Sequence, residues 1–223
     1  MGLEPVGGSD YVVSGKKSTS AGSHSVFLPS HDFWVMSFFI LLLGMSASPA
    51  ATHMALAFTS GGFDAASVAS AASIAGLLMV IAKPVYGMLG DRIGHRVTAV
   101  LYTVLIAAGF TVVVCTLFSN ASWMPMAAYV GYGIGGAVCT LGYPLWCMEW
   151  SPKQDYSKNL KRFQSAFQLG TLIASPIPGI VADITGSYAY FYVIPVLGYS
   201  LMTLCAMILY RKLDALRRTA GED

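Results

Sequence analysis

One lysine, Lys83, lies inside a long run of apolar residues, and its ammonium group is a candidate for binding an anion. An ionisable side chain at the centre of a membrane helix costs about 2.5–3.5 kcal/mol to insert, so such residues usually serve a function. Pro84 frees a backbone carbonyl in the previous turn, which is common where a helix lines a cavity. Alternatively, the side chain extends to a polar surface near Asp91, roughly 12 Å along the helix. We favour anion binding because no acid lies nearby in the same run.

Three other polar side chains lie within apolar runs and could share this anion site. His53 either faces a cavity, where titration near neutrality would suit proton coupling, or is a neutral, hydrogen-bonded structural residue. Tyr143 lies deep enough to reach a cavity, although the aromatic residues after it are typical of an interfacial belt. Gln168 shares a helix face with Gln164, and this pair could bind either a substrate or a neighbouring helix.

The residue pattern argues against several kinds of chemistry. The apolar runs contain no paired acids, no His/Cys set at metal-ligand spacing and no serine and histidine with an orienting acid, so we predict that the chain is not an enzyme. The four cysteines have no paired spacing, which favours packing over disulfides or a metal site. The absence of a Gly-x-x-x-x-Gly-Lys-Ser/Thr loop disfavours ATP-driven activity. We expect no cofactor, no metal and no nucleic-acid partner.

A compact charged segment separates two of the apolar runs. Its glycines allow a close approach of two backbones, and its aspartate can pair with the arginines beside it. We predict a conformational-switch loop that holds helix ends together in one state and releases them in another. The alternative is that the cations only set orientation in the membrane, but orientation requires neither the acid nor the glycines. The loop residues are Gly87, Asp91, Arg92, Gly94 and Arg96.

Six apolar segments, each near the ~20 residues that cross a bilayer, must position these groups. The chain has 223 residues, of which 55% are hydrophobic and only 11% charged, whereas a soluble domain has about 25% charged residues. The composition predicts an all-α membrane protein with a polar tail (1–32), a six-helix bundle (33–210) and a C-terminal tail (211–223). The predicted spans are 33–58, 67–90, 97–117, 124–148, 163–184 and 190–210.

The basic residues are segregated to one side of this layout. Twelve of the thirteen lysines and arginines precede the first span or follow the second, fourth and sixth, and Lys83 is the exception. By the positive-inside rule, both termini are cytoplasmic. Six buried helices of a soluble protein would not segregate charge in this way. We therefore expect a multi-pass protein of the plasma membrane, with the lipid bilayer as its first partner.

An internal repeat relates the two halves of the bundle. Four residues recur at an offset of 92 positions, once at the end of the second span and once at the end of the fifth. These two places face opposite sides of the membrane, so the sequence predicts two inverted three-helix repeats. The two sets are Pro84, Gly87, Asp91 and Gly94, and Pro176, Gly179, Asp183 and Gly186.

The charged loop, written Gly-x-Leu-Gly-Asp-Arg-x-Gly-x-Arg, resembles the signature loop of major facilitator superfamily transporters. Segments at 33–34, 83–87, 141–146 and 178–188 resemble the C-terminal half of oxalate/formate-antiporter-like and monocarboxylate-transporter-like members. The resemblance covers nearly the whole chain. It implies one half of a major facilitator fold and secondary active transport of a small carboxylate by alternating access.

The resemblance also bears on the substrate. The antiporter-like group is similar in having a basic residue four positions before the signature glycine, where this chain has Lys83. A second basic residue, expected near Gln168, is missing, and one cation balances one carboxylate better than two. A monocarboxylate is therefore favoured over oxalate, with anion exchange or proton symport as the mechanism. The candidate substrate-binding residues are Lys83, His53, Tyr143 and Gln168.

Finally, the resemblance implies a chain that acts with a partner. Residues 1–7 resemble the linker between the two halves of such transporters, which have twelve helices around a central cavity. We expect an N-terminal half, or a second copy in a homodimer, to complete the transporter. The alternative is a non-transporting membrane scaffold or receptor derived from a facilitator half. Carboxylate uptake with and without an N-terminal half distinguishes the two.

Overall fold

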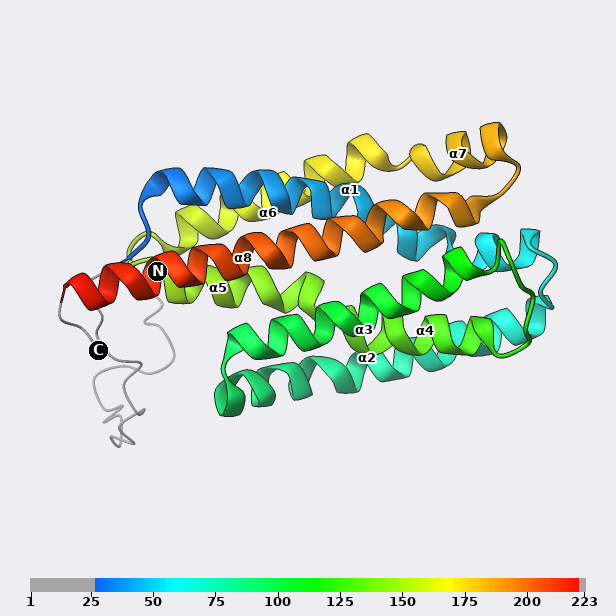
Figure 1. Cartoon of the computed structure of the whole chain (residues 1–223), viewed down its shortest axis with the longest axis horizontal. Coiled ribbons are helices and arrows are strands. Elements are labelled where there is room, and N and C mark those ends of the chain that lie inside the picture. Colours follow the sequence, from blue (N-terminus) through cyan, green and yellow to red (C-terminus); the bar gives the residue numbers. More distant parts are fainter. Residues whose placement is uncertain (1–26, 221–223) are drawn as a thin grey trace, which may run out of the picture.

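Six long apolar helical spans run side by side in the computed structural model, which describes residues 27–220 (Figure 1). Each is long and apolar enough to cross a membrane. Three spans are single helices: α1 (Ser30–Ser60), α2 (Ala65–Ile93) and α3 (His95–Cys115). The fourth consists of α4 (Met124–Gly135), a π-helix η1 (Val138–Gly142) and α5 (Tyr143–Trp150). The fifth contains α6 (Tyr156–Ala174) and α7 (Ile177–Thr185), and the sixth contains a 3-10 helix η2 (Tyr188–Tyr192) and α8 (Val193–Thr219).

The number and order of the predicted spans are confirmed, and two helices extend well beyond their predicted bounds. α6 begins at Tyr156 rather than at 163, and α8 continues to Thr219 rather than ending at 210. Both extensions are rich in lysine and arginine, which form helix readily once the helix leaves the apolar layer. Lys16, Lys17 and the linker-like residues 1–7 lie outside the described residues.

The packing order supports two inverted repeats. α1, in the first repeat, packs against α6 and α8 of the second repeat. Reciprocally, α4 of the second repeat packs against α2 and α3 of the first. The two repeats therefore interlock through equivalent helices. Figure 1 shows the result as two layers, with α1, α6 and α7 above and α2, α3 and α4 below.

Glycines permit the closest helix contacts. A Cβ atom on Gly44 would lie 2.1 Å from the backbone oxygen of Phe167, and one on Gly170 would lie 2.1 Å from that of Leu41, so any side chain would separate α1 from α6. Gly109 and Gly131 meet in the same way between α3 and α4. Such small-residue contacts are typical of membrane helices.

The repeated glycines have equivalent structural roles. Gly94 (φ 88°) ends α2, and Gly186 (φ 78°) ends α7. Their N–H groups donate to the carbonyl oxygens of Gly90 at 3.0 Å and Ala182 at 2.8 Å, four residues earlier in each case. Glycine is favoured at both positions because residues with a Cβ atom rarely adopt positive φ. The repeat is therefore present in the backbone as well as in the sequence.

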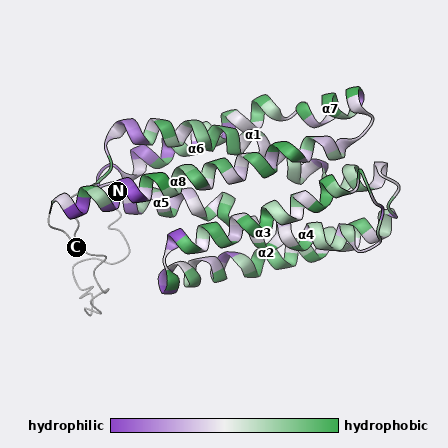
Figure 2. Cartoon of the chain, in the orientation of Figure 1, coloured by the Kyte–Doolittle hydropathy of each residue, from purple (hydrophilic) through white to green (hydrophobic). Residues whose placement is uncertain are grey.

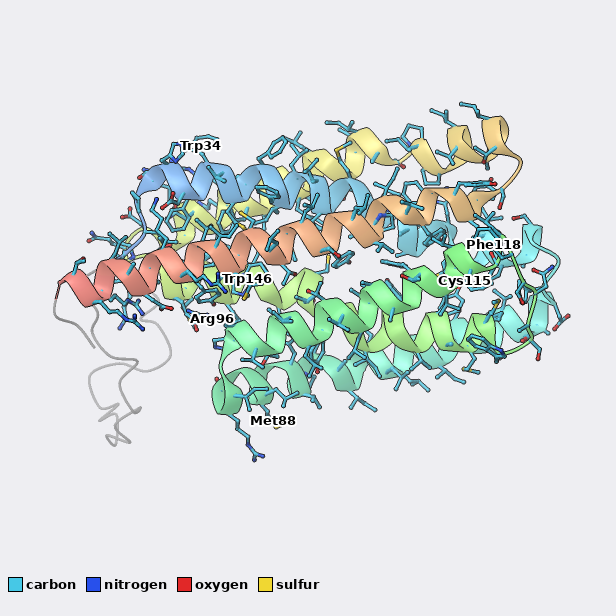
Figure 3. All side chains as sticks on the ribbon, in the orientation of Figure 1. Trp34, Met88, Arg96, Cys115, Phe118 and Trp146 are labelled. Carbon is cyan, nitrogen blue, oxygen red and sulfur yellow. The ribbon has the colours of Figure 1, made fainter. Side chains whose placement is uncertain are left out.

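Polar residues gather at one end of the bundle, which we call the charged end; it lies to the left in Figure 2. The ion pair between Asp32 and Lys212 brings the start of α1 to the end of α8 there. The apolar core fills the space between the layers, where Trp146 is fully buried, whereas Trp34 and Met88 lie on outer surfaces (Figure 3).

Candidate functional site

Lys83 lies within α2, which continues as a helix through Pro84. Its side chain is half-buried. α2 packs against η1 of the fourth span. None of the ion pairs formed within residues 27–220 includes Lys83. Lys83 therefore lies outside these ion pairs, on the helix that packs against the irregular segment of the fourth span.

Tyr143 is the first residue of α5, directly after η1, and is only 8% exposed. Its ring stacks on Phe167 of α6, with the centroids 6.2 Å apart. The neighbouring residue, Gln168, is exposed on α6. The structure therefore brings Tyr143 to the helix that presents Gln168.

His53 is half-buried on α1. Its Nδ1 atom lies 3.0 Å from the carbonyl oxygen of Pro49, and its ring stacks on Tyr188 of η2 at 6.1 Å. A carbonyl oxygen only accepts, so Nδ1 donates in this contact, and the Thr52 hydroxyl oxygen also lies 3.0 Å from Nδ1.

Three of the four candidates lie at comparable depth, and His53 does not. With 1.5 Å per residue, Lys83 lies ~15 Å from the charged end of α2, Tyr143 ~11 Å from that end of α5 and Gln168 ~18 Å from that end of α6. His53 lies ~35 Å along α1 from the same end. By this count along separate helices, Lys83, Tyr143 and Gln168 lie nearer the charged end than His53, which lies towards the opposite end.

The predicted switch loop forms the tight turn between α2 and α3. Gly87 lies on the last turns of α2, and Gly94 makes the turn itself. Asp91 and Arg92 are both exposed, and neither forms an ion pair in the part of the chain that the structure describes. Arg96 instead pairs with Asp214 of α8, with the Nη2 and Oδ2 atoms 2.8 Å apart. The latch role of Asp91 stays a prediction.

Three spans meet around Glu149 at the charged end. The Tyr210 hydroxyl of α8 donates to the Glu149 carboxylate, and His95 Nε2 lies 3.7 Å from the same carboxylate. The Arg96 guanidinium lies 4.7 Å above the Tyr210 ring. The start of α3 is therefore tied to α5 and α8 by polar side chains.

The model of the major facilitator superfamily matches residues 33–222, most of the chain. The chain belongs to the major facilitator superfamily. No curated protein matches the chain significantly. Members of this superfamily are membrane transporters, and the six apolar spans agree with one half of the facilitator fold.

Within this facilitator fold, sequence reasoning missed the ion pairs of the charged end. Lys212 Nζ lies 2.8 and 2.7 Å from the two carboxylate oxygens of Asp32, which is 5% exposed. The partners in this pair are 180 residues apart, as counted along the chain. The sequence offered only the opposite charges of these two residues, one just before the first predicted span and one just after the last. Such charges do not specify a pair.

Proposed function

We propose that this chain forms one six-helix half of a facilitator that carries a small monocarboxylate, and that Lys83 binds the carboxylate. The proposal is carried by Lys83, which is half-buried in the middle of a span and has no ion-pair partner among residues 27–220. A charge left in a membrane helix without a partner is costly, and a bound anion would offset that cost.

The number of charges favours one carboxylate per binding event. Lys83 is the one lysine or arginine in the middle of a span; the others in the described ranges lie at the charged end. A dicarboxylate would bring a second negative charge into a low-dielectric region with no cation to balance it. Tyr143 and Gln168, at a similar depth, are suited to hydrogen-bonding the rest of a small substrate.

The second and fifth spans support the proposal that another six-helix unit completes the transporter. In the most apolar stretch of each span, 22% of the residues are buried in the second span and 17% in the fifth. The corresponding shares in the other four spans are 44–56%. These two spans also carry the repeated prolines. Alternating access requires two bundles that rock about a central site, so we propose that the second unit packs across these spans.

The driving gradient in this proposal is that of a proton or of an exchanged anion. His53 is the residue proposed to carry the proton, because imidazole is the side chain that gains and loses a proton near neutrality. Its place near the end opposite the charged end would let it exchange protons with the medium there.

Ligand binding to the purified chain tests the role of Lys83 directly. The midpoint of thermal unfolding in detergent is measured with formate, acetate, lactate, oxalate or chloride at equal ionic strength. A ligand that binds the folded state at 100 times its Kd stabilises it by about 2.7 kcal/mol. We expect stabilisation of the wild type and Lys83→Arg by monocarboxylates, and its loss in Lys83→Gln. Lys153→Gln, which removes an exposed cation, is the matched control.

Two results would count against the proposal. Equal stabilisation of Lys83→Gln would remove Lys83 from the site. Uptake of labelled monocarboxylate into proteoliposomes is then measured with the chain alone and with an N-terminal facilitator half. Uptake that is absent in both cases would favour a non-transporting scaffold.

A further inference from the structure

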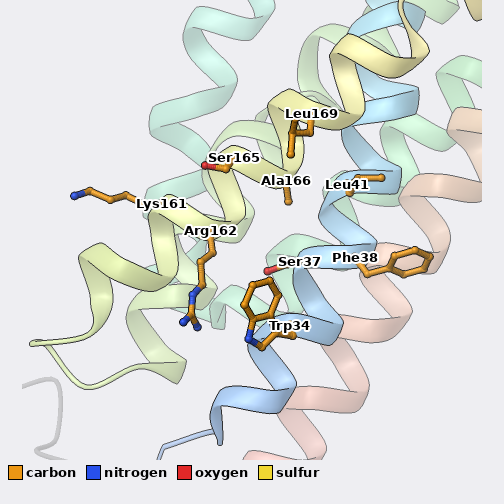
Figure 4. A pocket seen from close by; sticks show the side chains of 9 residues that line it. All are labelled: Trp34, Ser37, Phe38, Leu41, Lys161, Arg162, Ser165, Ala166 and Leu169. Atoms are coloured by element: carbon orange, nitrogen blue, oxygen red, sulfur yellow. The ribbon is translucent and has the colours of Figure 1, made fainter.

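A groove runs between α1 and α6 from the charged end towards mid-depth. It has a volume of about 490 Å³ (Figure 4). Trp34, Phe38 and Leu41 of α1 form one wall, and Ser165 and Leu169 of α6 form the other. The walls are almost entirely apolar, and none of the four candidate substrate-binding residues lines the groove. The groove is therefore distinct from the proposed carboxylate site.

Two cationic residues line the groove, Lys161 and Arg162; the Arg162 side chain points toward Trp34, whereas the Lys161 side chain extends outward (Figure 4). The Arg162 guanidinium lies 5.0 Å from the Trp34 ring centroid, which fixes it over the apolar wall. Its one side-chain hydrogen bond within the described residues is to Asn159 Oδ1, at 3.4 Å. No ion pair in the same part of the chain includes either cation. Positive charge is thus held beside the apolar groove, and it takes part in none of the ion pairs among the described residues.

A second, polar hollow of about 250 Å³ adjoins the groove, and Arg162 lines both. Lys158 adds a further cation to this hollow, and Asp155 contributes one acid. Arg162 therefore lies where the apolar groove meets the polar hollow. This is the arrangement that a molecule with a charged head and a hydrocarbon chain requires.

The depth of these groups matches the layers of a bilayer. Arg162 lies ~9 Å along α6 from its start at Tyr156, and Leu169 lies ~11 Å deeper. A cation near the end of a spanning helix lies at the level of lipid phosphates, and the next two to three turns lie in the hydrocarbon layer. Basic pockets between membrane helices bind anionic headgroups in this way.

We propose that this groove binds one anionic phospholipid. Its phosphate contacts Arg162, Lys161 adds positive charge beside it, and one acyl chain lies along the outer side of the α1–α6 contact against Phe38, Leu41 and Leu169. Arginine is suited to this role because its planar fork donates two hydrogen bonds to a phosphate. The occupant is a lipid because the groove opens on a membrane-spanning surface, where lipid is the solvent.

Lipid retention by the purified chain tests the proposal. Native mass spectrometry counts the lipids that remain bound when the chain, in a neutral detergent, is titrated with phosphatidylglycerol or with phosphatidylcholine of the same acyl chains. We expect the first phosphatidylglycerol to bind at least tenfold more tightly than phosphatidylcholine. Lys161→Gln combined with Arg162→Gln should abolish this preference. Lys153→Gln combined with Arg218→Gln removes the same charge from exposed positions outside both hollows and should preserve it.

A second variant separates the groove from general charge attraction. Ser165→Phe fills the apolar channel and leaves the charge unchanged, so it should also lose the tight phosphatidylglycerol site. Thermal unfolding of each variant checks that the bundle is intact. Equal retention of the two lipids by the wild type, an unaltered preference in either site variant, or equal loss in the Lys153/Arg218 control would each overturn the proposal. Displacement of the lipid by an added N-terminal facilitator half would assign the groove to that protein instead.

Discussion

The turn after α2 and the turn after α7 share a backbone design and differ in what surrounds it. Each is made by a repeated glycine with positive φ, Gly94 or Gly186. After Gly94, Arg96 reaches the distant helix α8. After Gly186, the side-chain bonds are local: Ser187 Oγ accepts from the N–H of Ala189 at 3.2 Å, and Thr185 Oγ1 donates to the Val181 carbonyl at 2.7 Å.

The repeated motif therefore meets two separate needs. The glycines are needed for folding, because both turns require a residue without Cβ where the helix ends. Among residues 27–220, the ion pairs between helices lie at the charged end, where they join helices of both repeats. Ion pairs between helices can break and re-form when helix ends move, whereas bonds within a turn move with it. We therefore expect conformational switching to depend on the charged end.

The largest expected effect on stability is at the buried acid of the charged end. Lys212→Met leaves the Asp32 carboxylate buried without its cation, so it should lower the free energy of unfolding by about 3 kcal/mol. Denaturation with sodium dodecyl sulfate from a mild detergent measures this. Asp32→Asn should recover most of the loss in the double variant. Arg211→Met, which removes an exposed neighbouring cation, should cost little; an equal loss there would show that net charge, not this pair, matters.

The two glycine turns can be compared directly by adding one methyl group to each. Gly94 has φ 88° and ψ 142°, a region that other residues almost never adopt, whereas Gly186 has φ 78° and ψ 0°, close to the left-handed helical region. Gly94→Ala should therefore destabilise by about 2–3 kcal/mol and Gly186→Ala by about 1 kcal/mol. Detergent denaturation of both variants provides the ranking. The reverse order would contradict the conformations described here.

The functional difference between the turns is tested at the repeated aspartates. If the switch acts at the charged end, Asp91→Asn should slow the proposed monocarboxylate uptake, measured with an N-terminal facilitator half, about tenfold, equivalent to about 1.4 kcal/mol in the rate-limiting step. Asp183→Asn should change uptake less than twofold. Initial rates in proteoliposomes, normalised to the amount of protein, give the comparison. Equal effects would mean that the two turns contribute equally to switching.

The smallest effect is expected for the Arg96–Asp214 pair. Its side chains are 40% and 42% exposed, so solvent screens their attraction. A double-mutant cycle with Arg96→Ala and Asp214→Ala should give a coupling energy of about 0.2–1 kcal/mol that decreases with added salt. A coupling above 2 kcal/mol would show that this pair closes the charged end by itself.

The prediction of the spans succeeded where long apolar runs leave a helix as the one way to satisfy the backbone in lipid. It placed two boundaries incorrectly, at Tyr156 and after 210, because charged residues outside the lipid are compatible with both helix and loop. The repeat was predictable because glycine and proline have narrow conformational roles. The roles of Lys83, His53, Tyr143 and Gln168 are still predictions, although three of these residues lie at comparable depth.

The sequence by itself determined the membrane class, the six spans, the gathering of cations at one end and the inverted repeat. These properties depend on the composition of single segments, and each segment meets the bilayer independently. Only the tertiary structure decided that Lys212 pairs with Asp32, that Arg96 reaches Asp214 and that Arg162 stands over Trp34 at the mouth of a groove. Such contacts depend on which helices become neighbours, and neighbours are chosen by packing between residues far apart in the chain.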